Sequence, residues 1–124
     1  MSAPSGKRQR AERKGRIAEL VAAGFLTLKG YAIVRSRFSS PVGEVDLIAR
    51  RGHCLAFVEV KYRRSMDTAI DAVTPKTRRR IGAAAGYFIS RNQKLSRLNI
   101  RYDIIALSGL RIRHLRDAWR DGGF

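Results

Sequence analysis

The segment of residues 43–64, GEVDLIARRGHCLAFVEVKYRR, restricts the fold more than any other part of the chain. It contains two apolar runs, at about residues 44–50 and 54–62, separated by a turn around Arg51 and Gly52, and this pattern predicts a β-hairpin. Charged residues nevertheless alternate with apolar ones inside both runs. The chain therefore places carboxylates and a lysine where valine would form a simpler strand.

The spacing of these residues predicts how the two strands face each other. Side chains alternate between the two faces of a strand, and a turn with an even number of residues places odd positions opposite even ones. A slip by one residue would drive charges into the core, so the apolar rows fix the register. One face then gathers Val45, Leu47, Ala49, Ala56, Val58 and Val60, and the other gathers Glu44, Asp46, Ile48, Phe57, Glu59 and Lys61.

Asp46, Glu59 and Lys61 are candidate catalytic residues because this register brings them within cross-strand reach. Neighbouring carboxylates repel each other unless a cation lies between them. Mg²⁺ and Mn²⁺ take oxygen ligands, and a lysine beside such an ion can hold an attacking water or stabilise charge on a phosphate. The alternative is a solvated strand face on which Lys61 pairs with Glu59 or Glu44. The apolar residues on the same face favour a partly covered site.

The net charge of +16, from 26 Lys and Arg against 10 Asp and Glu, indicates a polyanionic partner. Nucleic acid is the commonest one, and an anionic membrane surface or ribosomal RNA is the alternative. No apolar run approaches the roughly 18 residues of a membrane span, and no secretory signal is visible. We therefore expect a cytoplasmic protein that does not insert into membranes, and a homodimer is compatible with this interpretation.

The length of 124 residues indicates a single domain. We expect this domain at residues 9–124, after a flexible basic arm at residues 1–8. The only cysteine, Cys54, excludes an internal disulfide and is expected to be a small core residue.

Two helices are predicted, one on each side of the hairpin in the sequence. The first covers residues 11–29 and ends before Gly30. The second begins at Pro75, whose fixed φ suits the first helical turn. The expected buried stripes consist of Ile17, Leu20, Val21, Gly24 and Leu28 in the first helix, and of Ile81, Ala84, Ala85, Phe88 and Ile89 in the second.

Three further strands complete the pattern. The order α-β-β-β-α-β-β predicts an α/β protein with a mixed β-sheet flanked by helices. The additional strands are expected at residues 31–38, 99–107 and 110–119, turns at 39–43 and Gly109, and a loop at 64–75.

A basic cluster occupies the first turns of the second helix. Cations at a helix N-terminus oppose the helix dipole. This cost favours a role in phosphate contact, with binding that weakens as salt rises, over surface decoration. The cluster consists of Lys76, Arg78, Arg79 and Arg80.

The other chemically notable residues favour structural roles. Asp103 lies in an apolar strand near Arg101, which predicts an internal ion pair. His53 and His114 each stand alone and lack the spacing of metal ligands. Trp119 is expected to pack the C-terminal segment against the domain.

Asp46 followed by Glu59-Val60-Lys61 resembles the PD-(D/E)xK nuclease motif, in which an Asp ends one strand and Glu-x-Lys lies on the next. The likeness extends along most of the chain to the YraN family of small bacterial proteins. It implies a restriction-endonuclease-like fold similar to that of archaeal Holliday-junction resolvases. The segments that carry it are KGRIAELVAAGFLTLKGY, GEVDLIAR, LAFVEVKYR, RYDIIAL and HLRDAW.

The resemblance also implies roles for individual residues. Asp46 and Glu59 would bind one or two Mg²⁺ or Mn²⁺ ions together with the carbonyl of Val60, and Lys61 would act on the nucleophilic water. Glu19 of the first helix would be an additional acidic ligand, for which a solvated helix charge is the alternative.

Two positions depart from the pattern, with Val45 in place of a proline and Ala18 in place of a glycine. Fold and function also separate readily. We expect a metal-dependent endonuclease-like protein that acts on nucleic acid, with DNA, including branched DNA, favoured over RNA. The alternatives are a nucleic-acid-binding module without catalysis and a basic domain that binds RNA or a ribonucleoprotein.

Overall fold

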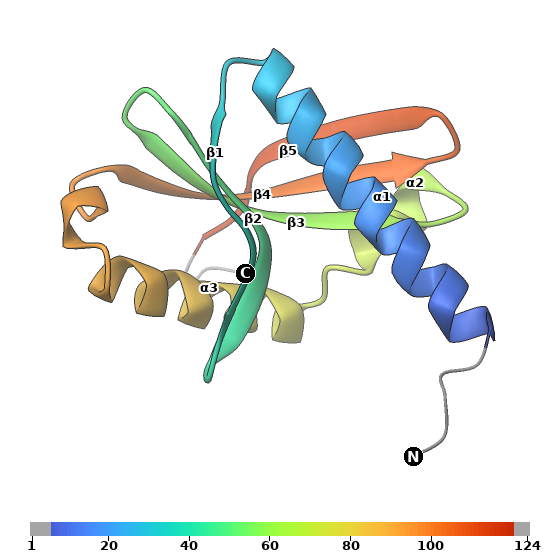
Figure 1. Cartoon of the computed structure of the whole chain (residues 1–124), viewed down its shortest axis with the longest axis horizontal. Helices are drawn as coiled ribbons and strands as arrows, with labels where there is room; N and C mark the ends of the chain where they lie inside the picture. The colour runs from blue at the N-terminus through green and yellow to red at the C-terminus, as the bar shows by residue number, and fades with distance from the viewer. Residues whose placement is uncertain (1–5, 121–124) are drawn as a thin grey trace.

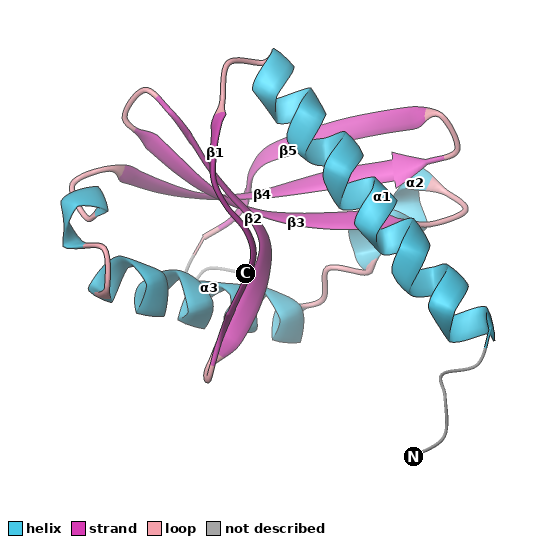
Figure 2. Ribbon diagram, in the orientation of Figure 1, coloured by secondary structure: helices cyan, strands magenta, loops and turns pink. Residues whose placement is uncertain are grey.

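The computed structural model describes the backbone of residues 6–120 and the side chains of residues 13–120. It is an α/β protein with a mixed sheet, which confirms the predicted class and order of elements (Figures 1 and 2). Of the expected arm at 1–8, residues 1–5 lie outside the described residues. The elements are α1 (Gly6–Leu28), β1 (Ala32–Ser40), β2 (Gly43–Arg51), β3 (Cys54–Tyr62), α2 (Met66–Asp71), α3 (Pro75–Ser90), a 3-10 turn η1 (Gln93–Leu95), β4 (Asn99–Ser108) and β5 (Arg111–Trp119).

The five strands lie in the sheet in their sequence order, β1-β2-β3-β4-β5. Only β3 and β4 are parallel, because α2 and α3 carry the chain back between them. Helix α1 packs on one face of the sheet, and α2 and α3 pack on the other (Figure 2). Both faces of the central strands are therefore buried.

The hairpin of β2 and β3 pairs odd positions with even ones, as predicted. Leu47 pairs with Val58, and the pairing continues to Arg51 and Cys54, which leaves Gly52 and His53 as a two-residue turn. Gly52 has a φ of 59°, a conformation that suits glycine at the first position of such a turn. The residues packed on the α1 side are Leu47, Ala49, Ala56, Val58 and Val60, as predicted.

Val45 is an exception to the predicted apolar row. It packs on the α3 side with Phe38, its partner in β1. Leu47, two positions along the same strand, packs on the α1 side instead, although such neighbours ordinarily share a face. Arg37 lies next to Phe38 in β1 and has a left-handed φ of 54°. Asp46 lies between Val45 and Leu47 in β2, and none of the described residues of β1 pairs with it.

The buried face of α1 differs from the predicted one. Alanines and one leucine contact the sheet, because their small side chains let the helix backbone approach it closely. The predicted stripe faces solvent instead, with Leu28 90% exposed. None of the described helices is long and apolar enough to cross a membrane. The buried residues are Ala18, Ala22 and Leu26, and the exposed ones are Ile17, Leu20, Val21, Gly24 and Leu28.

The segment 64–75, predicted as a loop, contains the short helix α2. The Ser65 hydroxyl accepts a hydrogen bond from the Thr68 N–H at 3.1 Å and caps this helix, which buries Ala69. Helix α3 begins at Pro75 as predicted, with Thr74 as its cap. Its buried residues are Ile81, Ala84, Ala85 and Phe88, and Ile89 packs at the edge of the same cluster.

Two predictions about single residues have different outcomes. Trp119 is buried and stacks on Tyr102 with ring centroids 5.2 Å apart, so it packs the last strand onto the domain as predicted. Cys54 is only partly buried at the start of β3, so its assignment to the core was wrong.

The turn between β1 and β2 approaches α3 at Gly43. A Cβ atom on Gly43 would lie 2.1 Å from the carbonyl oxygen of Arg80. We expect Gly43→Ala to lower the free energy of unfolding by about 1–3 kcal/mol, because two backbone segments would have to separate. Urea denaturation measures this change.

Gly86→Ala is the matched control for this prediction. Gly86 lies within α3 with no other atom near the position of a Cβ. The alanine should raise the free energy of unfolding by roughly 0.5–1 kcal/mol through its better helix propensity. Equal effects of the two substitutions would contradict the proposed close contact.

Candidate active site

Asp46 lies where β2 separates from β3. The regular pairing ends at Leu47 and Val58. Beyond this pair the Asp46 Oδ2 atom accepts a hydrogen bond from the Val60 N–H at 2.8 Å. The carboxylate thus takes the place of a backbone carbonyl in the ladder. This bond fixes the orientation of Asp46 relative to β3.

Glu59 brings a second carboxyl group to Asp46. The residue is 8% exposed. Burial is the main cause that raises the pKa of Glu59 to about 9, followed by the hydrogen bond with Asp46 and its charge. Lys61 opposes this rise, with its Nζ atom 4.0 Å from the Glu59 Oε2 atom. The Glu59 carboxyl group therefore keeps its proton at neutral pH.

Glu19 of α1 lies close to this pair. Its Oε2 atom accepts a hydrogen bond from the Arg37 Nε atom at 2.8 Å, and its side chain is 19% exposed. Burial and then the charge of Asp46 raise the pKa of Glu19, while Arg37 lowers it. Glu19 is thus a partly buried carboxylate that is paired with Arg37.

These residues line one cleft of about 760 Å³ between α1 and the first three strands. Helix α1 crosses one face of the sheet (Figure 1). The lining contains both carboxylates and cations. The charged lining residues are Lys14, Glu19, Arg37, Glu44, Asp46, Glu59, Lys61, Arg63 and Arg64. The cleft can thus contact both a cation and a phosphate.

The residues of the cleft fit a hard divalent cation in part. The carboxyl groups of Asp46 and Glu59 and the carbonyl of Val60 are oxygen donors, which Mg²⁺ and Mn²⁺ prefer. Within residues 13–120, no group of three His, Cys, Asp or Glu side chains is arranged to hold a metal ion. Two carboxyl groups meet, and the third, on Glu19, is paired with Arg37.

The basic cluster of α3 lies outside the cleft. The Arg78 Nε atom donates to the carbonyl of Val73 at 3.1 Å, and its guanidinium lies over the Trp119 ring at 5.5 Å. The predicted role of Arg78 was phosphate contact, and the structure shows that its side chain also contacts other parts of the protein. The other three members, Lys76, Arg79 and Arg80, are exposed.

Three cations of the cleft lining, Arg37, Arg63 and Arg64, were not singled out for this role from the sequence. Arg63 and Arg64 directly follow the Glu-x-Lys motif, so their position in the sequence was a usable signal. Arg37 had no such signal, because only the folded arrangement of β1 and α1 brings it to the cleft.

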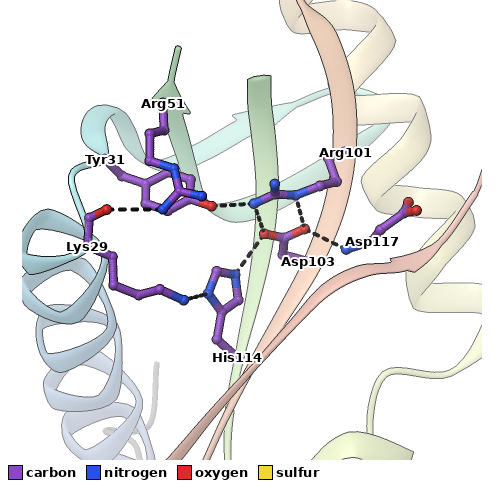
Figure 3. A network of polar contacts seen from close by, with 7 residues as sticks. All are labelled: Lys29, Tyr31, Arg51, Arg101, Asp103, His114 and Asp117. Carbon is purple, nitrogen blue, oxygen red and sulfur yellow. Dashed lines mark hydrogen bonds and ion pairs between the residues drawn. The ribbon is translucent and has the colours of Figure 1, made fainter. Parts of the chain in front are cut away.

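A buried polar network lies away from the cleft, near the C-terminal end of α1 (Figure 3). Arg101 donates to both carboxylate oxygens of Asp103, at 2.9 and 2.8 Å, which confirms the predicted ion pair. The Asp117 N–H donates to Asp103 as well, at 3.0 Å. Arg101 also donates to the hydroxyl of Tyr31. Asp103 is fully buried and fully hydrogen-bonded.

His114 belongs to this network, so the prediction that it stands alone was wrong. Its Nε2 atom is 2.8 Å from the Asp103 Oδ2 atom, and its Nδ1 atom is 2.7 Å from the Lys29 Nζ atom. A lysine ammonium can only donate, so Nδ1 accepts and Nε2–H donates to Asp103. His114 thereby bridges a lysine and an aspartate. His53 is exposed in the turn between β2 and β3.

Residues 18–107 match the uncharacterised protein family UPF0102. The chain is 46% identical over 122 residues to the UPF0102 protein amb4503 of Paramagnetospirillum magneticum, covering 94% of this chain and 95% of that protein. A UPF0102 protein of Chelativorans sp. is 51% identical over 100 residues, 81% of each chain. The UPF0102 protein R00337 of Rhizobium meliloti is 47% identical over 117 residues, 94% of this chain and 96% of that protein.

Proposed function

The chain belongs to the uncharacterised protein family UPF0102, and from the geometry of its cleft we propose that it hydrolyses phosphodiester bonds of nucleic acid with a divalent cation. Membership of the YraN family, another name for UPF0102, is thereby confirmed. The observation that carries the proposal is the meeting of the Asp46 and Glu59 carboxyl groups beside Lys61 in a cleft with cationic walls.

Asp46, Glu59 and the carbonyl of Val60 would hold Mg²⁺ or Mn²⁺ in this cleft. Such an ion polarises a phosphate oxygen and lowers the pKa of water. Glu59 must lose its proton to serve as a ligand, so metal binding and deprotonation are coupled. The ammonium of Lys61 lies beside the pair, where it can orient an attacking water or stabilise charge on the phosphate.

The cationic residues of the cleft support a polyanionic substrate. Lys14, Arg63 and Arg64 line the same cleft as the carboxyl pair, and the chain carries a net charge of +16. Binding to phosphates should therefore weaken steeply as salt rises. We favour DNA, including branched DNA, as the substrate, and a cytoplasmic location would give access to it.

We expect the protein to cleave labelled DNA in the presence of Mn²⁺, and Asp46→Asn and Lys61→Met to lose this activity. The loss should be at least about a hundredfold, because each substitution removes a charge that acts on the reacting phosphate. Gel assays with single-stranded, duplex and four-way-junction DNA measure it, and circular dichroism checks the fold.

Lys94→Ala is the matched control for Lys61→Met, because it removes one positive charge from η1, outside the cleft. It should retain the activity of the wild type. Cleavage that persists in Asp46→Asn, or activity without any divalent cation, would exclude the proposed chemistry.

A nucleic-acid-binding module without catalysis is the second candidate. The observation that favours it is that Asp46 is already hydrogen-bonded, to the Val60 N–H and to the Glu59 carboxyl group, without a metal ion. In that case DNA binding would survive Asp46→Ala, or tighten as a negative charge is removed. Competition between structured DNA and ribosomal RNA would separate this module from a basic domain that binds RNA or a ribonucleoprotein.

A further inference from the structure

Arg37 combines three features at the edge of the cleft. It has a φ of 54°, which costs a non-glycine residue roughly 1 kcal/mol or more. Its Nε atom donates to the Glu19 carboxylate at 2.8 Å. Its side chain is 53% exposed although it lines the cleft. A strained backbone that presents an accessible guanidinium to a cleft is typical of functional positions.

We propose that Arg37 is a phosphate-binding residue that holds Glu19 apart from the Asp46–Glu59 pair until a phosphate of the nucleic acid takes its place. Glu19 then joins the pair as a third carboxylate ligand. This inference rests on the proposed function, because it assumes that the pair accepts a divalent cation and that the cleft accepts a phosphate.

The chemistry of the guanidinium favours this exchange. Arginine binds phosphate through two parallel N–H donors, whereas Glu19 engages only its Nε atom in the structure. The Arg37–Glu19 pair is partly exposed, and such pairs are weak enough for a competing anion to replace. A phosphate can therefore displace Glu19 without disruption of the core.

The surroundings of Glu19 favour its transfer to the carboxyl pair. Glu19 lines the same cleft as Asp46 and Glu59, and the charge of Asp46 reaches it. Two carboxylates that repel each other are stabilised by a cation between them. Among the described residues no three potential ligands are arranged for a metal ion while Glu19 is bound to Arg37. Release of Glu19 would complete that set.

The metal side of the exchange is tested by calorimetric titration of Mn²⁺ into the full-length protein. Arg37→Ala should tighten Mn²⁺ binding about two- to fivefold, because it frees Glu19. Arg64→Ala removes a positive charge from the same cleft without freeing Glu19 and should have a smaller effect. Arg37→Asn serves as a second variant, because asparagine tolerates the left-handed backbone.

A double-mutant cycle with Glu19→Gln isolates the coupling between the two residues. In the Glu19→Gln background, Arg37→Ala should no longer tighten Mn²⁺ binding more than Arg64→Ala does. If Arg37→Ala and Arg64→Ala have equal effects in the wild-type background, the exchange is overturned.

The phosphate side is tested by fluorescence anisotropy of a labelled DNA duplex in EDTA. Glu19→Gln frees Arg37 and should tighten DNA binding about two- to fivefold more than Glu44→Gln, which removes a charge from the same cleft. Arg37→Ala should weaken binding more than Arg64→Ala. Equal effects of Glu19→Gln and Glu44→Gln would overturn the exchange.

Asp46→Asn separates this inference from the proposed function. If Asp46→Asn loses Mn²⁺ while the variants of Arg37 and Arg64 behave alike, the metal site stands and the exchange is wrong. If wild type and Asp46→Asn bind Mn²⁺ equally, both the proposed function and the exchange are wrong.

Discussion

Replacing Asp103 with asparagine is expected to lower the free energy of unfolding by on the order of 3 kcal/mol. The Asp103 carboxylate is fully buried and accepts hydrogen bonds from Arg101, His114 and the Asp117 N–H. Burial alone would raise the pKa of Asp103, yet these bonds outweigh it and hold the pKa below its ordinary value. The carboxylate is therefore charged, and its loss would leave Arg101 without its buried counter-ion.

Asp117→Asn is the matched control for this substitution. It makes the same chemical change on an exposed side chain that pairs with Arg120. Asparagine also tolerates the φ of 56° at this position. The free energy of unfolding should change by about 1 kcal/mol or less. Urea denaturation at neutral pH compares the two variants, and equal losses would show that the network does not stabilise the fold.

The hairpin and the parity of its pairing could be predicted from the sequence, because a slip by one residue would drive charges into the core. Leu47 and Val58 pair as the rows require. The same argument could not foresee that Val45 packs on the α3 side of the sheet, next to the position where Arg37 has a left-handed backbone. A left-handed arginine has no sequence signal, because the surrounding packing imposes it.

The choice of buried face on α1 could not be read from hydrophobicity. Its apolar stripe, with Leu20 and Leu28, is exposed, while Ala18 and Ala22 contact the sheet. Small side chains allow a closer approach, and that preference appears only when the sheet is present. The helix α2 was missed for a different reason, because six residues are too few for periodicity to be detected.

Only the part of the candidate site that lies on β2 and β3 could be predicted from the sequence. Asp46, Glu59 and Lys61 could be placed together from alternation along β2 and β3. The pairing of Glu19 with Arg37 joins a helix to a strand, and the pairing of His114 with Lys29 joins residues 85 positions apart. Contacts of this kind follow from the packing of α1 on the sheet, which single-sequence patterns do not encode.

The protonation of Glu59 should make both stability and metal binding depend on pH. Its pKa of about 9 in the folded protein lies above the ordinary value of 4.5, so the folded state binds more protons between these limits. The contribution of Glu59 to the free energy of unfolding is fully present below its ordinary pKa of 4.5. It is lost as pH rises toward the upper limit, by up to about 1.4 kcal/mol per pH unit. Glu59→Gln should not show this loss.

A cation that needs the ionised Glu59 competes with this proton. Its affinity should therefore rise about tenfold per pH unit below the pKa of the pair. Binding should also release about one proton per ion. The metal affinity thus rises with pH, whereas the free energy of unfolding of the metal-free protein falls. The two differ because a bound ion stabilises the deprotonated Glu59, whose charge is otherwise unfavourable in its buried position.

Titration calorimetry of Mn²⁺ from about pH 6 to about pH 8, in buffers of different ionisation enthalpy, tests the carboxyl pair most directly. The wild type should bind about tenfold more tightly per pH unit and release about one proton per ion. Glu59→Gln and Asp46→Asn should lose both the affinity and the proton release. An affinity of the wild type that does not change with pH, or equal binding by Asp46→Asn, would contradict a metal site built on these two carboxyl groups.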